Sequence, residues 1–96
     1  MMMIETYSNI LSVLNKNWTH TKVSYNVIVS IKFCGLFNKS YIRSKIDSIM
    51  HHWIVLYASD NDDVTTCLDE LQQTVTEVIS RVLKRYVKIK QIDIKF

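Results

Sequence analysis

The clearest pattern in the chain is a helical one over residues 64–86. Apolar side chains recur there every three or four residues, which places them on one side of an α-helix. These side chains are Val64, Cys67, Leu68, Leu71, Val75, Val78, Ile79, Val82, Leu83 and Tyr86. Acidic residues lie toward the start of the segment and basic residues toward its end, which complements the helix macrodipole. The pattern predicts an amphipathic helix whose broad apolar side must be covered by other elements.

Two segments alternate between apolar and polar positions, as β-strands do. Residues 23–33 alternate over their whole length, and the only glycine, Gly35, follows them. Residues 87–96 also alternate, but the period slips by one residue near Gln91. A β-bulge absorbs a slip of this kind. The sequence therefore predicts two strands, the second of which contains a bulge.

The other apolar segments predict two helices and a further strand. Residues 3–17 have apolar positions at helical spacing, which indicates a short N-terminal amphipathic helix. Residues 38–52 predict a second helix, with Asn38 as its N-cap and His51 and His52 at its end.

Residues 53–58 are apolar without alternation, which is typical of a central strand covered on both faces. The polar residues 59–63 then form a turn that leads into the long helix. Either Asp63 or Thr66 is expected to cap the start of that helix.

Together these elements predict one α/β (α+β) domain over residues 1–96, with the order α-β-α-β-α-β. The core spans residues 21–96, and the N-terminal helix of residues 1–18 packs either on this core or outside it. The sheet has three strands, or four if the strand at 23–33 bends into two, and the helices pack on it. Strand–helix–strand units favour parallel neighbours joined by right-handed crossovers. A sheet this small has two exposed edges, which proteins often cover with a partner or a second copy.

The composition indicates in which cellular compartment and in what kind of genome the protein is expected. No stretch approaches the ~20 consecutive apolar residues of a membrane helix, and the first residues do not resemble a secretory signal. We therefore interpret Cys34 and Cys67 as reduced, buried thiols of an intracellular protein in the cytoplasm or nucleus. Residues with A+T-rich codons dominate the chain, which favours an A+T-rich source genome such as that of a virus.

Motifs for catalysis, cofactors and metals are missing from the sequence. A single glycine excludes the phosphate-binding loops, and the acidic turn at 60–63 lacks the glycine and the final glutamate of a calcium loop. The histidines and cysteines, among them the adjacent His51 and His52, do not have the spacing of metal ligands. The sequence thus predicts a protein without catalytic activity, cofactor or metal.

Charge is distributed unevenly along the chain. The net charge is +3, yet residues 60–80 carry six acidic residues and no basic one, whereas residues 81–96 are strongly basic. The best candidate for a binding surface is this basic run with its interleaved aromatic residue, a composition that suits phosphate contacts and base stacking. Its residues are Arg81, Lys84, Arg85, Tyr86, Lys88 and Lys90. The same charges also suit the solvent face of an amphipathic helix.

The leading functional hypothesis is a protein-association module that binds itself or another protein. Homo-oligomers would form through a sheet edge or through the N-terminal helix, and no membrane is involved. The alternative is a nucleic-acid-binding domain that uses the basic run at 81–90, although a net charge of +3 is mild for such a protein.

Overall fold

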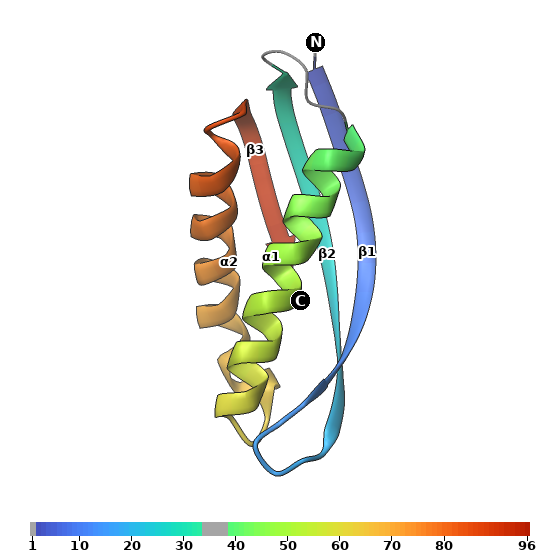
Figure 1. Ribbon diagram of the computed structural model, residues 1–96, viewed down its shortest axis with the longest axis vertical. Helices are drawn as coiled ribbons and strands as arrows, with labels where there is room; N and C mark the ends of the chain where they lie inside the picture. The colour runs from blue at the N-terminus through green and yellow to red at the C-terminus, as the bar shows by residue number, and fades with distance from the viewer. Residues whose placement is uncertain (1, 34–38) are drawn as a thin grey trace.

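A computed structural model describes residues 2–33 and 39–96 and shows two layers, an antiparallel sheet and two helices that cover one of its faces (Figure 1). The elements are β1 (Met2–Leu14), β2 (His20–Phe33), α1 (Lys39–Asp60), the short 3₁₀ helix η1 (Val64–Cys67), α2 (Leu68–Leu83) and β3 (Val87–Lys95). The class is α+β, but the predicted order of helices and strands is wrong. The molecule measures 46 by 20 by 17 Å, because strands and helices run along one common axis.

The three strands lie in the order β1-β2-β3, and both pairs are antiparallel. The predicted parallel neighbours are therefore wrong. A hairpin joins β1 to β2, while two helices in succession carry the chain away from the end of β2 and back again, so β3 starts beside that end (Figure 1). The register of β2 with β3 shifts between Ser30 and Ile31, which pair with Gln91 and Ile89. This shift leaves Lys90 as the extra residue and confirms the bulge predicted near Gln91.

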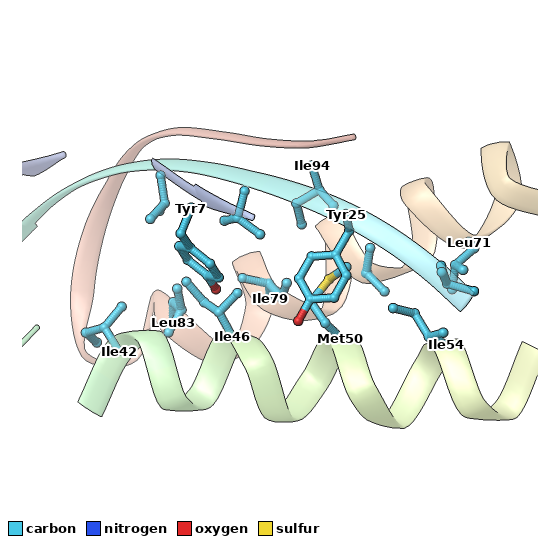
Figure 2. Close-up of a cluster of buried hydrophobic side chains, with 14 of the residues drawn as sticks. Tyr7, Tyr25, Ile42, Ile46, Met50, Ile54, Leu71, Ile79, Leu83 and Ile94 are labelled. Carbon is cyan, nitrogen blue, oxygen red and sulfur yellow. The ribbon is translucent and has the colours of Figure 1, made fainter. Parts of the chain in front are cut away.

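The core fills the space between the sheet and the two helices (Figure 2). The strand predicted at 23–33 is confirmed as part of β2, and its inward side chains are buried: Val23, Tyr25, Val27, Val29 and Ile31. Each helix adds a row of buried residues spaced by four, namely Ile42, Ile46, Met50, Ile54 and Ala58 from α1 and Leu71, Val75, Ile79 and Leu83 from α2. The apolar stripe predicted for residues 64–86 therefore faces the core, as expected.

Asp63, one of the two predicted candidates, caps the 3₁₀ helix η1 that precedes α2, whereas the N-cap of α2 itself is Cys67, which makes no side-chain capping hydrogen bond. The Asp63 carboxylate accepts a hydrogen bond from the backbone N–H of Thr65 at 3.0 Å. Thr66 does not cap α2, and its hydroxyl instead donates to the carbonyl oxygen of Asp63 at 2.8 Å.

The predicted N-terminal helix is wrong, because this segment is strand β1. Odd-numbered positions such as Met3, Tyr7 and Val13 point to the helices and are buried. Even-numbered positions point to the opposite face, where Ile4 and Ile10 are exposed. Apolar residues thus occur on both faces of β1, and together they imitate the spacing of a helix.

The predicted strand at 53–58 is also wrong, because α1 continues through Asp60. His51 and His52 consequently lie in the middle of this helix and not at its end. Ile54 continues the buried row of α1, while Val55 and Leu56 are exposed on the other side of the helix. The apolar run has no visible period because α1 carries apolar residues on its solvent face as well.

The two cysteines and the segment between β2 and α1 were also the subject of predictions from the sequence. Cys34, Gly35 and Asn38 lie outside the described residues. Cys67 is a free, half-buried thiol whose Sγ lies 3.2 Å from the carbonyl oxygen of Val64, and burial raises its pKa. Within residues 2–33 and 39–96, neither helix has the combination of length and apolar character that a bilayer span needs.

Candidate functional site

The two edges of the sheet differ in their protection against pairing with another chain. Edge strand β3 has a bulge, and its side chains include the exposed lysines Lys88, Lys90 and Lys95. Edge strand β1 is longer, with 13 residues, pairs with β2 without a register shift, and has Glu5 as its only charged residue. Bulges, lysines, prolines and inward-pointing charged residues are the usual means by which proteins block an exposed edge. β1 has one inward-pointing charge, Glu5, which pairs with Lys39, but no lysine, proline or bulge. Of the two edges of the described sheet, β1 therefore presents the longer and less protected row of backbone N–H and C=O groups.

The apolar side chains on the outer face of the sheet are concentrated on this same strand. Ile4 and Ile10 are 70% and 61% exposed, and Met2 and Leu14 are exposed beside them. The outer positions of the neighbouring strand β2 are largely polar, and the hydroxyl of Ser8 donates a hydrogen bond across to Asn26. An open backbone edge and an apolar column of side chains thus coincide on β1.

A small polar network fixes α1 over β1. The hydroxyl of Tyr25 donates to Asp47 Oδ1 at 3.2 Å and accepts a hydrogen bond from Asn9 Nδ2 at 3.1 Å. The guanidinium of Arg43 lies 4.1 Å from the centre of the Tyr7 ring. Tyr7 and Tyr25 project from their strands toward α1, and the buried hydroxyl of Tyr7 has no hydrogen-bond partner among the described residues (Figure 2). The network fixes the position of the helix relative to the β1 edge.

The tip of the β1–β2 hairpin is held against the loop that follows α1. Asn15 Nδ2 donates to the carbonyl oxygen of Asp62 at 2.7 Å, and Asn17 Nδ2 donates to the Asp62 carboxylate at 3.0 Å. Lys16 forms an ion pair with the same carboxylate at 3.5 Å. Trp18, also in this tip, has a positive φ of 62° and is 82% exposed. Asp62 therefore has a structural role at the acidic end of the molecule.

The basic run predicted as a nucleic-acid site lies at the opposite end. Lys84, Arg85, Tyr86 and Lys88 line an open groove of about 600 Å³ between the end of α2 and the start of β3. The remaining two residues of the run, Arg81 and Lys90, are exposed but do not line this groove. The structure thus brings together four of the six predicted residues.

Further basic residues reach this end from distant parts of the sequence. Lys32 of β2 lies directly opposite Lys88 of β3, and Lys45 Nζ lies 5.4 Å from the centre of the Tyr86 ring. Ion pairs of the described residues join Lys16 to Asp62, Lys39 to Glu5 and Lys95 to Asp93, and none involves the run at 81–90. Lys32 and Lys45 were not predicted as part of the site, because only the strand register and the helix packing bring them to this end.

The Tyr86 ring is held by neighbouring side chains. It makes an edge-to-face contact with Tyr41 of α1, with ring centres 6.1 Å apart and an interplanar angle of 84°. Tyr86 is also half-buried. This ring therefore stabilises the contact between α1 and the end of α2, and it is less available for stacking on a base than its place in the sequence indicates.

The histidine pair lies on the exposed side of α1. His51 and His52 share an open groove of about 560 Å³ with Ser44, Asp47 and Ser48. No hydrogen bond between a serine and a histidine occurs in this groove within the described part of the chain. That part also contains no cluster of three residues suited to a metal ion. The observed partner of Asp47 is Tyr25, which gives this carboxylate a structural role.

No family model matches the sequence, and the comparisons with curated proteins and with solved structures likewise find no match. The function is therefore inferred from the geometry and chemistry of the chain itself.

The tyrosine network predicts opposite effects for two matched substitutions. Tyr7→Phe removes a buried hydroxyl without a partner, so we expect the free energy of unfolding to rise by about 1 kcal/mol. Tyr25→Phe breaks two hydrogen bonds, so we expect a loss of about 1–2 kcal/mol. Urea unfolding followed by circular dichroism measures both changes. An equal loss in the two variants would show that the Tyr7 hydroxyl has a partner in solution.

The same tyrosines predict a loss of stability at high pH. Burial, together with the nearby Asp47 carboxylate, raises the pKa of Tyr25 to about 12, and the same two causes raise the pKa of Tyr7. Because tyrosine in the unfolded chain ionises near pH ~10, the folded state holds these protons more tightly. The contribution of these two groups to the free energy of unfolding is therefore fully present below about pH 10. It decreases as the pH rises toward the pKa values of the tyrosines in the folded state. Urea unfolding curves and tyrosinate absorbance measured between about pH 9 and about pH 12 test this prediction. A free energy of unfolding that stays constant up to about pH 12 would contradict it.

Proposed function

We propose that this chain is a non-catalytic association module that pairs with a second copy of itself through the edge of β1. The single observation that supports this function most strongly is the contrast between the two edges. The β3 edge is blocked by a bulge and lysines, whereas the 13-residue β1 edge has one charge and no bulge. Exposed edges of this kind pair readily with another strand.

The chemistry of β1 supports association through this strand. Backbone N–H and C=O groups along an edge provide hydrogen bonds to an added strand, and side chains at alternate positions provide specificity. On β1 these side chains include Ile4 and Ile10, which are exposed to solvent in the single chain. A helix-mediated association through residues 1–18 is no longer an option, because this segment is a strand.

The experiment is a measurement of solution mass by light scattering at about 0.05 M and about 0.5 M salt. Backbone pairing and apolar contact resist salt, so we expect a dimer under both conditions. The double variant Ile4→Lys/Ile10→Lys places charges on the exposed column of β1 and is expected to be monomeric. The matched control Gln73→Lys/Gln91→Lys adds the same charge at exposed positions of α2 and β3, away from β1, and should remain dimeric. A monomeric wild-type protein, or a dimer that survives the β1 double variant, would refute association through this strand.

A second candidate function, binding of a nucleic-acid backbone, is favoured by the arrangement at the basic end. Lys32 and Lys88 lie directly opposite each other on adjacent strands, and Lys84 and Arg85 line the groove next to them. Like charges at directly opposite strand positions are destabilising unless an anion neutralises them. Phosphate groups along a nucleic-acid strand would supply this neutralisation.

This second function predicts a specific loss of oligonucleotide binding. The triple variant Lys84→Gln/Arg85→Gln/Lys88→Gln should abolish the binding of a mixed-sequence single-stranded oligonucleotide at low salt. The control Lys16→Gln/Lys22→Gln/Lys95→Gln removes the same charge elsewhere and should retain most of the affinity. For every phosphate that the protein no longer neutralises, the slope of log affinity against log salt should fall by about 0.7, as measured by fluorescence anisotropy. Equal losses of affinity in the two variants would indicate non-specific attraction and exclude a site in the groove.

A further inference from the structure

We infer that the two copies pair antiparallel about a two-fold axis at Tyr7, so that β1 of each copy joins one continuous six-stranded sheet. This inference rests on the proposed self-association and specifies its partner, orientation and register. A two-fold dimer is the commonest symmetric assembly, and its interface must be complementary to itself. β1 fulfils this requirement in one register far better than in its neighbours.

The register centred on Tyr7 matches residues of like polarity. The pairs across the axis are Met3 with Leu11, Ile4 with Ile10, Glu5 with Asn9, Thr6 with Ser8, and Tyr7 with Tyr7 of the second copy. At these positions apolar residues meet apolar residues and polar residues meet polar residues, while Met2 at the start of the strand would lie opposite Ser12. Such cross-strand pairs are the unit that stabilises a sheet.

The adjacent registers give poorer matches. An axis at Ser8 places Ile4 opposite Ser12 and Glu5 opposite Leu11. An axis at Thr6 places Ile4 opposite Ser8 and Glu5 opposite Tyr7. Both alternatives set a charged or polar side chain against an apolar one at positions where the Tyr7 register does not.

The exposure of β1 side chains agrees with this register. Leu11 faces the helices but is only half-buried, because nothing lies beyond the open edge in the single chain. The pairing would bring Met3 of the second copy against Leu11 on the helix-facing side. On the outer face, it would bring the exposed Ile4 and Ile10 of the two copies together in two equivalent contacts.

Charge complementarity favours the antiparallel over the parallel orientation. Lys39 and Arg43 lie beside the first half of β1, through contacts with Glu5 and Tyr7. Asp62 lies beside the hairpin tip, at the other end of the 46 Å long molecule. This length exceeds the screening distance of about 8–10 Å, so the two ends act as separate charges. Lys39 is ion-paired with Glu5 and Asp62 with Lys16, so the net charge of the two ends comes from Arg43 and from Asp60 and Asp63, which flank Asp62 in the sequence. An antiparallel pair sets each basic end beside the acidic end of the other copy, whereas a parallel pair would set like charges together.

Cysteine cross-linking tests the register directly. Thr6 and Ser8 are exposed on the outer face of β1, and each would face the other across the seam. In a Cys34→Ser/Cys67→Ser background, one chain carries Thr6→Cys, and a second chain, distinguished by a tag, carries Ser8→Cys. Mixing the two chains under mild oxidation should give a disulfide-linked heterodimer on a non-reducing gel. Either variant alone should form no covalent homodimer. The two equivalent thiols would then lie on diagonal positions about 7–8 Å apart, beyond the reach of a disulfide.

The outcomes separate the register from the self-association on which it rests. A covalent homodimer of Ser8→Cys alone would move the axis to Ser8 and overturn the inferred register. A dimer by light scattering without any cross-link at these positions would overturn the pairing through β1 while self-association through another surface stands. A monomer that binds only an extended peptide of another protein would overturn both proposals, because the edge would then serve a different partner.

Discussion

The buried row of the central strand β2 is the feature on which the rest of the structure depends. Five of its side chains, from Val23 to Ile31, point to one face and have almost no contact with solvent. Because no single helix is wide enough to cover this face, α1 and α2 must lie side by side on it (Figure 1). Both helices are used on the same face, so the opposite face of the sheet and the edge at β1 stay open. The surface proposed for association is thus open as a consequence of how the core is covered.

The elements predicted correctly from the sequence are those with apolar residues on one side only. β2, α2 and the bulged β3 have a single apolar face, so their periods are visible in the sequence. β1 and the second half of α1 are different, because Ile4, Ile10, Val55 and Leu56 add apolar residues to faces that point to solvent. These additions hide the true period. The two segments that were predicted wrongly are therefore those that carry surplus apolar surface, and one of them is the proposed interface.

The candidate sites were predictable only in part, for a related reason. The basic run at 81–90 is continuous in sequence and was identified, whereas Lys32 and Lys45 join it through the register of β2 with β3 and the packing of α1. The aromatic residue of the run was expected to be available for stacking, yet Tyr86 packs edge-to-face on Tyr41. The exposed edge was expected, but its identity was not, because the order of the strands depends on the direction in which two successive helices return the chain.

The position of β3 in the chain has a consequence for the order of folding. The hairpin of β1 and β2 needs only a short loop to close, whereas the pairing of β2 with β3 must wait until both helices lie between them. Docking of the last strand is thus the most non-local step in forming the sheet. Until it occurs, β2 has an open edge beside its buried row, and at high chain concentration the β3 of a neighbouring molecule can occupy that position instead.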